Sequence, residues 1–544
     1  MNINNTYFFV LKVIIYLNWL KNKFDILKPP KESGIMNKLS GALKNMKSKT
    51  KTENEANAYK DSGSDLLNFF ARSSAMRKAN KKEIYSLFDK AFLEDKKLAL
   101  KALFYLRDIR GGQGERRAFK AILNELAYRY PEYIKKNLDL ISFYGRYDDY
   151  YALFDTPLEK EVALYLKNQI KEDLNKEDPS LCAKWLKSEN ASSDETIRLA
   201  KKTINHFGWS ERKYRKTLSK LRKKIDIVER KMSNNDWQEI EYDKVPSKAT
   251  MKYIDAFYRH DQDGYEKFQK QLESGEKNIN AGSLYPYEII REIENIIHNV
   301  FTFDYIFGEI KKEKIENNKK ENMVKIKTLE EQWKALNDYI DGEKSINNLC
   351  VVDVSGSMEG LPMQVAVSLG MYFAERAEGP YKDHFITFSN KPEMIKITGS
   401  TLYDKVFNME RSDWDNNTNI EAVFDLILDK AVKNNVIQSE MPDKIFIISD
   451  MEFDMAINNN SKDVLFEKLR KKYKEYFYEL PKLYFWNVDS RQNNFPVTKD
   501  TENTALISGF SPSVFEYILK DKKVNPYQLM VDVLNSERYE RVVV

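Results

Sequence analysis

The chain has 544 residues, of which 42% are apolar, 13% aromatic and 31% charged. This is the composition of a globular protein, and the length predicts roughly three or four domain-sized units. Two cysteines and four histidines exclude a disulfide framework and a Cys-rich zinc site, and they leave little material for His-based catalysis. The low cysteine content fits a reducing compartment, so we expect a cytoplasmic protein.

Residues 1–50 predict a poorly ordered extension. The stretch 7–20 is the most apolar, but Lys12 and Asn18 interrupt it, and it is shorter than the roughly 20 residues that a membrane-spanning helix needs. It also lacks the basic start and small-residue cleavage site of a signal peptide. Because Met36 offers another translation start, residues 1–35 are either an over-extended start or a loosely attached surface helix. No other span is apolar enough for a membrane.

Residues 51–345 predict an all-α domain. Apolar residues recur at helical spacing within 91–106 and 119–126, Pro131 opens a helix through Leu140, and Pro157 opens one to Leu174. More than 200 residues of helices with short polar connections are typical of an α-solenoid or a large helical array. No clean repeat of fixed period is present, so HEAT-like repetition is an expectation from the helix pattern alone.

From residue 346 onward, short apolar runs alternate with amphipathic helices, which predicts a doubly wound α/β domain over 346–544. Nearly all-apolar strands indicate a parallel sheet covered on both faces. The segment 394–398 follows the preceding strand closely enough to form one antiparallel edge hairpin. The expected strands are 349–354, 384–389, 444–450, 483–489 and 504–510, and the expected helices are 362–377, 420–433 and 462–473.

Charge divides along the same boundary. Residues 346–544 hold 23 Lys and Arg against 30 Asp and Glu, whereas residues 1–345 hold 65 against 53. A basic half joined to an acidic half suggests two tasks, of which the first involves a polyanion.

A set of oxygen ligands is predicted at one edge of the α/β sheet. Asp353, Ser355 and Ser357 directly follow a buried strand, and Asp450 ends another. Thr418 lies in the polar loop 412–419. In an open α/β sheet, ligands bind beyond the carboxyl ends of the strands, and carboxylate and hydroxyl oxygens suit a hard divalent cation such as Mg²⁺. The alternative is that Asp353 only caps the following helix through its backbone amides.

The order DxSxS, Thr, Asp resembles the metal-ion-dependent adhesion site of von Willebrand factor A-type domains. The resemblance implies that Asp353, Ser355, Ser357, Thr418 and Asp450 hold the cation. It also implies that the cation keeps waters and one open position, which a partner's carboxylate fills. Asp454 is either an outer member of the site or an ordinary surface carboxylate.

A catalytic interpretation finds little support. A bound metal can activate water or polarise a phosphate, but the loops of the motif contain no His or Lys to act as an acid or base. The glycine-rich stretch RGGQGERR at 110–117 lacks the ending of a phosphate-binding loop and does not follow an apolar strand. We therefore expect no enzyme.

A second feature is a basic segment at 201–231, with 12 Lys and Arg against three acidic residues. On a helix, part of this charge forms a stripe that can follow phosphates, although an ordinary solvated helix face is the alternative. Trp209 and Tyr214 could stack on unpaired bases or belong to the core. The candidate RNA-binding residues are Arg212, Lys213, Arg215, Lys216, Lys220 and Lys223.

The arginines around 107–117 are either a salt-bridged corner between helices or part of an RNA-facing surface. Together with SGSDLLNFF (62–70), VPSKATMKY (245–253), NINAGSLYPYEII (278–290) and the DxSGS motif, LRDIRGGQGERRAF (106–119) resembles the Ro autoantigen (TROVE-type) family. It resembles more closely an uncharacterised family of the same plan, known only as a domain of unknown function. The Ro resemblance implies a cytoplasmic ring of helical repeats closed by an A-type domain, which binds RNA ends in a positive central hole and structured RNA outside.

These features lead to two hypotheses about function. The first is a non-enzymatic RNA-binding protein, expected to be a monomer. The second is an interaction scaffold that binds a partner carboxylate through Mg²⁺.

Overall fold

The computed structural model describes residues 49–306, 312–340, 347–387, 392–411, 419–453, 465–519 and 525–544. Within this part, residues 50–544 form one compact unit. The predicted division into a helical part and an α/β part is confirmed. The first elements of the described residues are two short paired strands, β1 (Lys49–Lys51) and β2 (Asn57–Tyr59).

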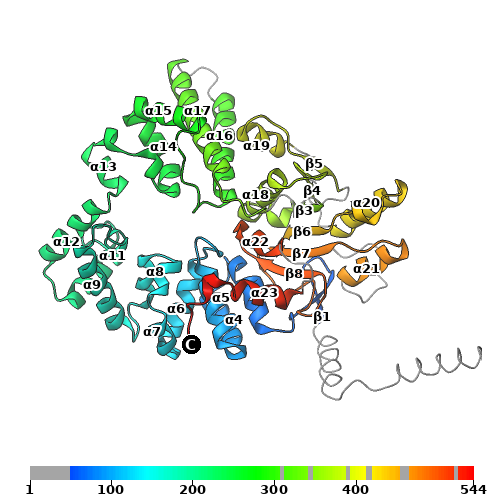
Figure 1. The fold of residues 1–544 in the computed structure, drawn as a ribbon, viewed down its shortest axis with the longest axis horizontal. Helices are drawn as coiled ribbons and strands as arrows, with labels where there is room; N and C mark the ends of the chain where they lie inside the picture. The colour runs from blue at the N-terminus through cyan, green and yellow to red at the C-terminus, as the bar shows by residue number, and fades with distance from the viewer. Residues whose placement is uncertain are drawn as a thin grey trace, which may run out of the picture. The chain divides into compact units, whose positions relative to one another are not determined.

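Helices follow one another as far as residue 334 (Figure 1). They are α3 (Asp65–Arg72), α4 (Lys81–Glu94), α5 (Lys96–Arg107), α6 (Arg117–Arg129), α7 (Pro131–Lys136), α8 (Leu140–Tyr144), α9 (Glu159–Asn175), α10 (Cys182–Trp185), α11 (Asp194–Phe207), α12 (Glu211–Lys224), α13 (Val228–Asn234), α14 (Ser247–His260), α15 (Gln262–Glu273), α16 (Pro286–Ile306) and α17 (Lys312–Lys334).

Two predicted helices are broken in the structure. The periodic segment 91–106 is split between α4 and α5 at Asp95, whose extended backbone lets its carboxylate accept a hydrogen bond from the Leu98 amide. The helix expected from Pro131 to Leu140 ends at Lys136 and resumes as α8. Asn137 lies at that break and its side chain donates to the Tyr133 carbonyl oxygen. In both cases a short polar side chain satisfies backbone groups that the helix would otherwise pair.

The α/β part follows the predicted alternation closely. Its elements are β3 (Asn348–Val352), α18 (Leu361–Arg376), β4 (His384–Thr387), β5 (Met394–Lys396), α19 (Leu402–Glu410), α20 (Ile420–Lys433), β6 (Lys444–Ser449), α21 (Leu465–Glu475), β7 (Lys482–Asn487), β8 (Thr504–Ser508), α22 (Phe515–Ile518) and α23 (Pro526–Leu534).

The six strands form one sheet in the order β5-β4-β3-β6-β7-β8 (Figure 1). Only the edge strand β5 is antiparallel, which confirms the predicted hairpin. In the register, Val352 lies opposite Ile448, and Ser449 lies opposite Asn487. The strands β3, β6 and β7 therefore end side by side, and the residues that follow them meet at one edge of the sheet.

The helical part packs directly on this sheet. Helix α3 contacts β8, α16 contacts α18, and α23 lies between α5 and β8. At the end of the chain, Arg538 forms an ion pair with the fully buried carboxylate of Asp108, and Tyr539 donates a hydrogen bond to the same carboxylate. None of the helices in the described ranges is long and apolar enough to cross a membrane.

Candidate functional site

The DxSGS motif forms a tight turn at the carboxyl end of β3. The Asp353 backbone amide still belongs to the sheet and donates to the Ile448 carbonyl oxygen at 3.0 Å. The Asp353 carboxylate then accepts the Ser355 backbone amide at 3.0 Å and the Ser449 hydroxyl at 2.6 Å. Asp353 and Ser355 are buried, and Ser357 is half-buried. The turn therefore places the oxygen atoms of Asp353 and Ser355 in the buried interior and the hydroxyl of Ser357 nearer to solvent.

Asp450 completes this cluster from the end of β6. The Ser357 hydroxyl donates to Asp450 Oδ2 at 2.8 Å, and the hydroxyl oxygens of Ser355 and Ser357 are 3.1 Å apart. Mg²⁺ takes oxygen ligands at about 2.0–2.1 Å in octahedral geometry, so neighbouring ligands lie roughly 2.9 Å apart. Three of the oxygens therefore already have the spacing of adjacent ligands, and the donor set fits a hard cation.

Ionisation of Asp353 is disfavoured where it lies. Burial, and then the nearby Asp450, raise the pKa of Asp353 from 3.8 to about 6, against the lowering effect of its hydrogen bonds to Ser449 and Ser355. A divalent cation would offset both causes by neutralising the buried charge.

Two of the predicted site residues lie outside the described residues: Thr418, which is the remaining predicted ligand, and Asp454. The predicted extension also lies outside them, apart from residues 49 and 50. Within the described ranges, no three His, Cys, Asp or Glu side chains group as a metal site. The candidate therefore rests on two carboxylates together with serine hydroxyls.

Sequence reasoning missed Ser449, Arg491 and Glu53. Arg491 Nη2 lies 2.5 Å from Asp450 Oδ2, on the same oxygen that accepts the Ser357 hydroxyl, and its Nη1 lies 3.4 Å from Glu53 Oε2. Arg491 follows β7, so its position just past a neighbouring parallel strand was the available signal. Glu53 comes from a segment about 400 residues away that hydrogen-bonds to the Glu452 side chain, and no local pattern indicates this contact.

The second predicted site lies on α12, which is amphipathic. Tyr214, Leu218 and Leu221 are buried, and the opposite face carries the basic stripe. All six candidate RNA-binding residues are exposed. In the part of the chain that the structure describes, four of them have no ion-pair or hydrogen-bond partner for the charged group: Arg212, Lys216, Lys220 and Lys223.

The other two candidates have partners. Arg215 forms an ion pair with Glu189, and the Lys213 ammonium lies 5.0 Å from the centre of the Trp209 ring. Of the two alternatives for Tyr214, the structure supports the core, because the residue is 1% exposed and its hydroxyl donates to the Lys187 carbonyl oxygen at 2.8 Å. Trp209 is half-buried and packs edge-on against Phe207, so its main contacts are also internal.

The arginine-rich stretch 107–117 is largely a corner between helices. Arg107 is 2% exposed and pairs with the fully buried Asp149 at 2.7 Å, and Arg116 pairs with Asp148 and Asp149. Arg117 donates to the carbonyl oxygens of Arg77 and Ala79. The contacts of these three arginines therefore support the salt-bridged corner between helices and not an RNA-facing surface.

Two family models match the chain. One, described as Domain of unknown function (DUF2828), matches residues 52–144 and 208–345, and the other, Domain of unknown function (DUF7788), matches residues 347–541. The chain is 31% identical over 525 residues to "Uncharacterized protein L728" of Acanthamoeba polyphaga mimivirus, which covers 89% of this chain and 86% of that protein. The expected relation to an uncharacterised family is thus confirmed.

Among solved structures, the Deinococcus radiodurans Ro (RSR) protein is similar at 13% identity, over 87% of this chain and 99% of that one. The TM-score is 0.30, which is too low to establish a common fold.

Proposed function

We propose that this chain, which belongs to the protein family of the mimivirus protein L728, is a non-enzymatic RNA-binding protein whose α/β part binds Mg²⁺. The supporting observation is the exposed basic face of α12. This helix carries eight Lys and Arg against one Glu, and only one of the eight, Arg215, is neutralised by a carboxylate in the described residues. A row of unneutralised cations attracts the phosphates of a nucleic acid backbone and releases their counterions.

The experiment measures how fluorescein-labelled RNA binds to the full chain as the salt concentration rises. Neutralising four contacts should weaken binding and reduce the slope of log K against log salt by roughly 2.8 for single-stranded RNA, at about 0.7 per phosphate. The variant carries Arg212→Gln, Lys216→Gln, Lys220→Gln and Lys223→Gln.

The matched control removes four exposed lysines on other helices: Lys81→Gln, Lys82→Gln, Lys160→Gln and Lys171→Gln. It has the same net charge as the α12 variant, so it should bind RNA nearly as the wild type does. Equal losses in both variants would mean that only net charge matters, and an unchanged slope in the α12 variant would remove this helix from the interface.

Asp353, Ser355, Ser357 and Asp450 would hold the cation, which when bound supplies a Lewis-acid position for an anionic oxygen. The protein's own contribution is to fix the donors. Asp353 is oriented by the Ser449 hydroxyl and the Ser355 amide, and Asp450 is oriented by the amide of Glu452 at 3.0 Å.

The second candidate function is a scaffold that binds a partner's carboxylate through the cation. The observation that favours it is the half-buried Ser357, which places one edge of the donor set next to solvent. A protein captured in Mg²⁺ and lost both in EDTA and with Asp353→Asn would support this function. RNA binding that is insensitive to both changes would support the first function.

A further inference from the structure

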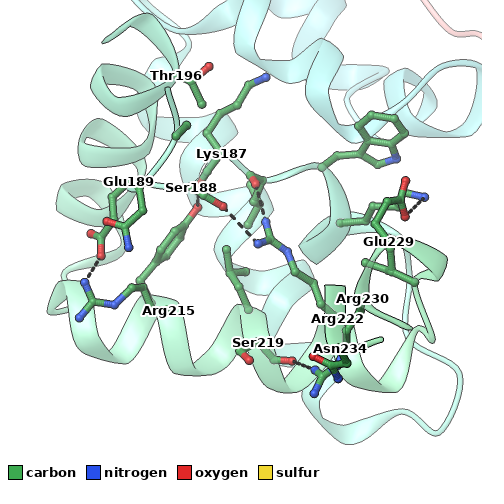
Figure 2. Close-up of a pocket in the computed structure, with 18 residues that line it drawn as sticks. Lys187, Ser188, Glu189, Thr196, Arg215, Ser219, Arg222, Glu229, Arg230 and Asn234 are labelled. Atoms are coloured by element: carbon green, nitrogen blue, oxygen red, sulfur yellow. Dashed lines mark hydrogen bonds and ion pairs between the residues drawn. The ribbon is translucent and has the colours of Figure 1, made fainter. Parts of the chain in front are cut away.

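The helical part contains a cavity of about 850 Å³ beside the basic face of α12. One wall is the end of α10 and the connection that follows it, residues 184–191, and the other is formed by α12 and α13 (Figure 2). The DUF2828 model matches residues 52–144 and 208–345. Residues 184–191 lie between these two segments, and α12 lies inside the second one. A volume of this size holds a small organic ligand and is far larger than a bare phosphate requires.

The lining has an excess of positive charge. Five basic side chains face two acidic ones, Glu189 and Glu229. Arg215 pairs with Glu189, and Lys184 lies 4.0 Å from Glu229. The remaining three cations, Lys187, Arg222 and Arg230, have no carboxylate partner among the described residues. A ligand with a phosphate group would supply the missing negative charge.

The guanidinium of Arg222 is already held in position to donate hydrogen bonds to an anion. Its Nε donates to the Ala183 carbonyl oxygen at 2.9 Å. Its Nη2 donates to the Leu186 carbonyl oxygen at 2.9 Å and its Nη1 to the Ser188 hydroxyl at 3.1 Å (Figure 2). All three acceptors are neutral. Because a guanidinium has five N–H groups and three are used here, one N–H on each terminal nitrogen remains to bind a phosphate. Burial lowers the pKa of Arg222, which shows how poorly its charge is solvated without a counterion.

Other lining groups suit the nucleoside part of a ligand. The half-buried Trp185 gives the cavity an accessible aromatic surface, and the buried Tyr214 and Leu218 line the wall opposite residues 184–191. The Glu189 side chain is 6% exposed, and its Oε2 has no hydrogen-bond partner among the described residues. A buried, unpaired carboxylate oxygen is costly, and an N–H of a base or a ribose hydroxyl would satisfy it. Inorganic phosphate would leave the aromatic surface uncovered.

We propose that this cavity binds one unpaired nucleotide of an RNA strand whose neighbouring phosphates follow the basic face of α12. Arg222 binds the phosphate of this nucleotide, and Glu189 accepts a hydrogen bond from the base or ribose. Lys187 and Arg230 lie on opposite sides of the Arg222 guanidinium (Figure 2), so each binds a neighbouring phosphate of the strand. This inference rests on the proposed RNA-binding function and adds a defined subsite to it. Arg215 and Arg222 belong to α12 and also line the cavity, so the two surfaces are continuous.

The test uses the full chain with a fluorescein-labelled uridine 12-mer, and with UMP as the free nucleotide. The variant is Lys187→Gln with Arg230→Gln, because neither side chain holds the fold together: Lys187 lies over the Tyr151 ring at 5.5 Å, and Arg230 reaches the Ser219 carbonyl oxygen at 3.4 Å. We expect the 12-mer to bind about 100-fold more weakly or worse, as for two lost charged hydrogen bonds. The salt slope should fall by roughly 1.4.

Two controls separate a subsite from general electrostatics. Lys160→Gln with Lys171→Gln makes the same charge change on the exposed side of α9 and should leave binding nearly unchanged. Lys187→Arg with Arg230→Lys keeps the charge and should retain most of the affinity. A 12-mer with one 4-thiouridine should crosslink to the segment 184–191 in the wild type and lose that crosslink in the cavity variant.

The outcomes distinguish this inference from the proposed function. Wild-type binding in the cavity variant, with loss of binding in the α12 variant, would overturn the subsite and leave RNA binding intact. A wild type that binds no RNA would overturn both, and UMP bound in the cavity would then identify a free nucleotide as its ligand. A crosslink confined to other segments would also overturn the subsite.

Discussion

Replacing Asp353 with asparagine should make the metal-free protein more stable at neutral pH. The pKa of Asp353 is 3.8 when unperturbed and about 6 in the folded protein, because of burial and the neighbouring Asp450. One pKa unit corresponds to about 1.4 kcal/mol, so ionised Asp353 lowers the free energy of unfolding by about 3 kcal/mol at pH 8. Asparagine has nearly the same shape, stays neutral, and can still accept the Ser355 amide.

The sign of the pH dependence follows from the raised pKa. The folded state binds the proton more tightly than the unfolded state, so the contribution of Asp353 to the stability of the metal-free wild type falls as the pH rises from about 4 to about 6 and is then constant. The advantage of Asp353→Asn should be about 3 kcal/mol at pH 8 and about half of that at pH 5. Mg²⁺ should stabilise the wild type and leave the variant unchanged, because the ion binds only the folded donor set.

The assay is thermal denaturation of the full chain in EDTA and in Mg²⁺ at both pH values. Asp429→Asn, at an exposed position on α20, is the control and should change stability by less than about 0.5 kcal/mol. If Asp353→Asn melts below the wild type in EDTA at pH 8, or if Mg²⁺ stabilises both proteins equally, then Asp353 is not the strained carboxylate of a cation site.

Two other substitutions test the surroundings of the site and the arginine-rich corner. Arg491→Gln should tighten Mg²⁺ binding about 20-fold in calorimetric titration. It removes a positive charge within about 4.6 Å of an ion bound to Asp450, and the repulsion between the two charges is about 2 kcal/mol even at the dielectric constant of water. Weaker binding in the variant would mean that Arg491 supports the ion site and does not compete with the ion. Gly112→Ala should lower the free energy of unfolding by about 3 kcal/mol or more in chemical denaturation, because its Cβ would lie 2.1 Å from the Tyr105 carbonyl oxygen, whereas Gly282→Ala, with no atom closer than 3.6 Å, should be tolerated. Equal effects at the two glycines would contradict the close approach.

The α/β part was predictable because its strands are long apolar runs with polar ends. The strand expected at 444–450 is β6, one residue shorter, and the helix expected at 420–433 matches α20 at both ends. Once the strands are parallel, their carboxyl ends must share one edge, so the meeting of Asp353 with Asp450 followed from topology alone. Helix breaks were harder, because a single capping side chain such as Asp95 decides them.

Contacts between distant segments could not be predicted. Arg491 meets Glu53 across more than 400 residues of sequence, and one sequence taken by itself contains no signal for that pairing. The role of Tyr214 could not be predicted from the sequence either. A tyrosine within a basic helix suits either stacking or the core, and only the packing of the residues around Lys187 against α12 decides between them.

Residues 538–543 close a group of helices that lies some 400 residues earlier in the sequence. The Asp108 carboxylate is buried against Arg538 and Tyr539, and the Asn137 side-chain amide donates to the Val543 carbonyl oxygen. A ribosome synthesises Asp108 some 430 residues before these partners, so the emerging helical segment holds an uncompensated acid until residues 538–543 have been made. A deletion of residues 538–543 will therefore be felt in helices α5 and α7.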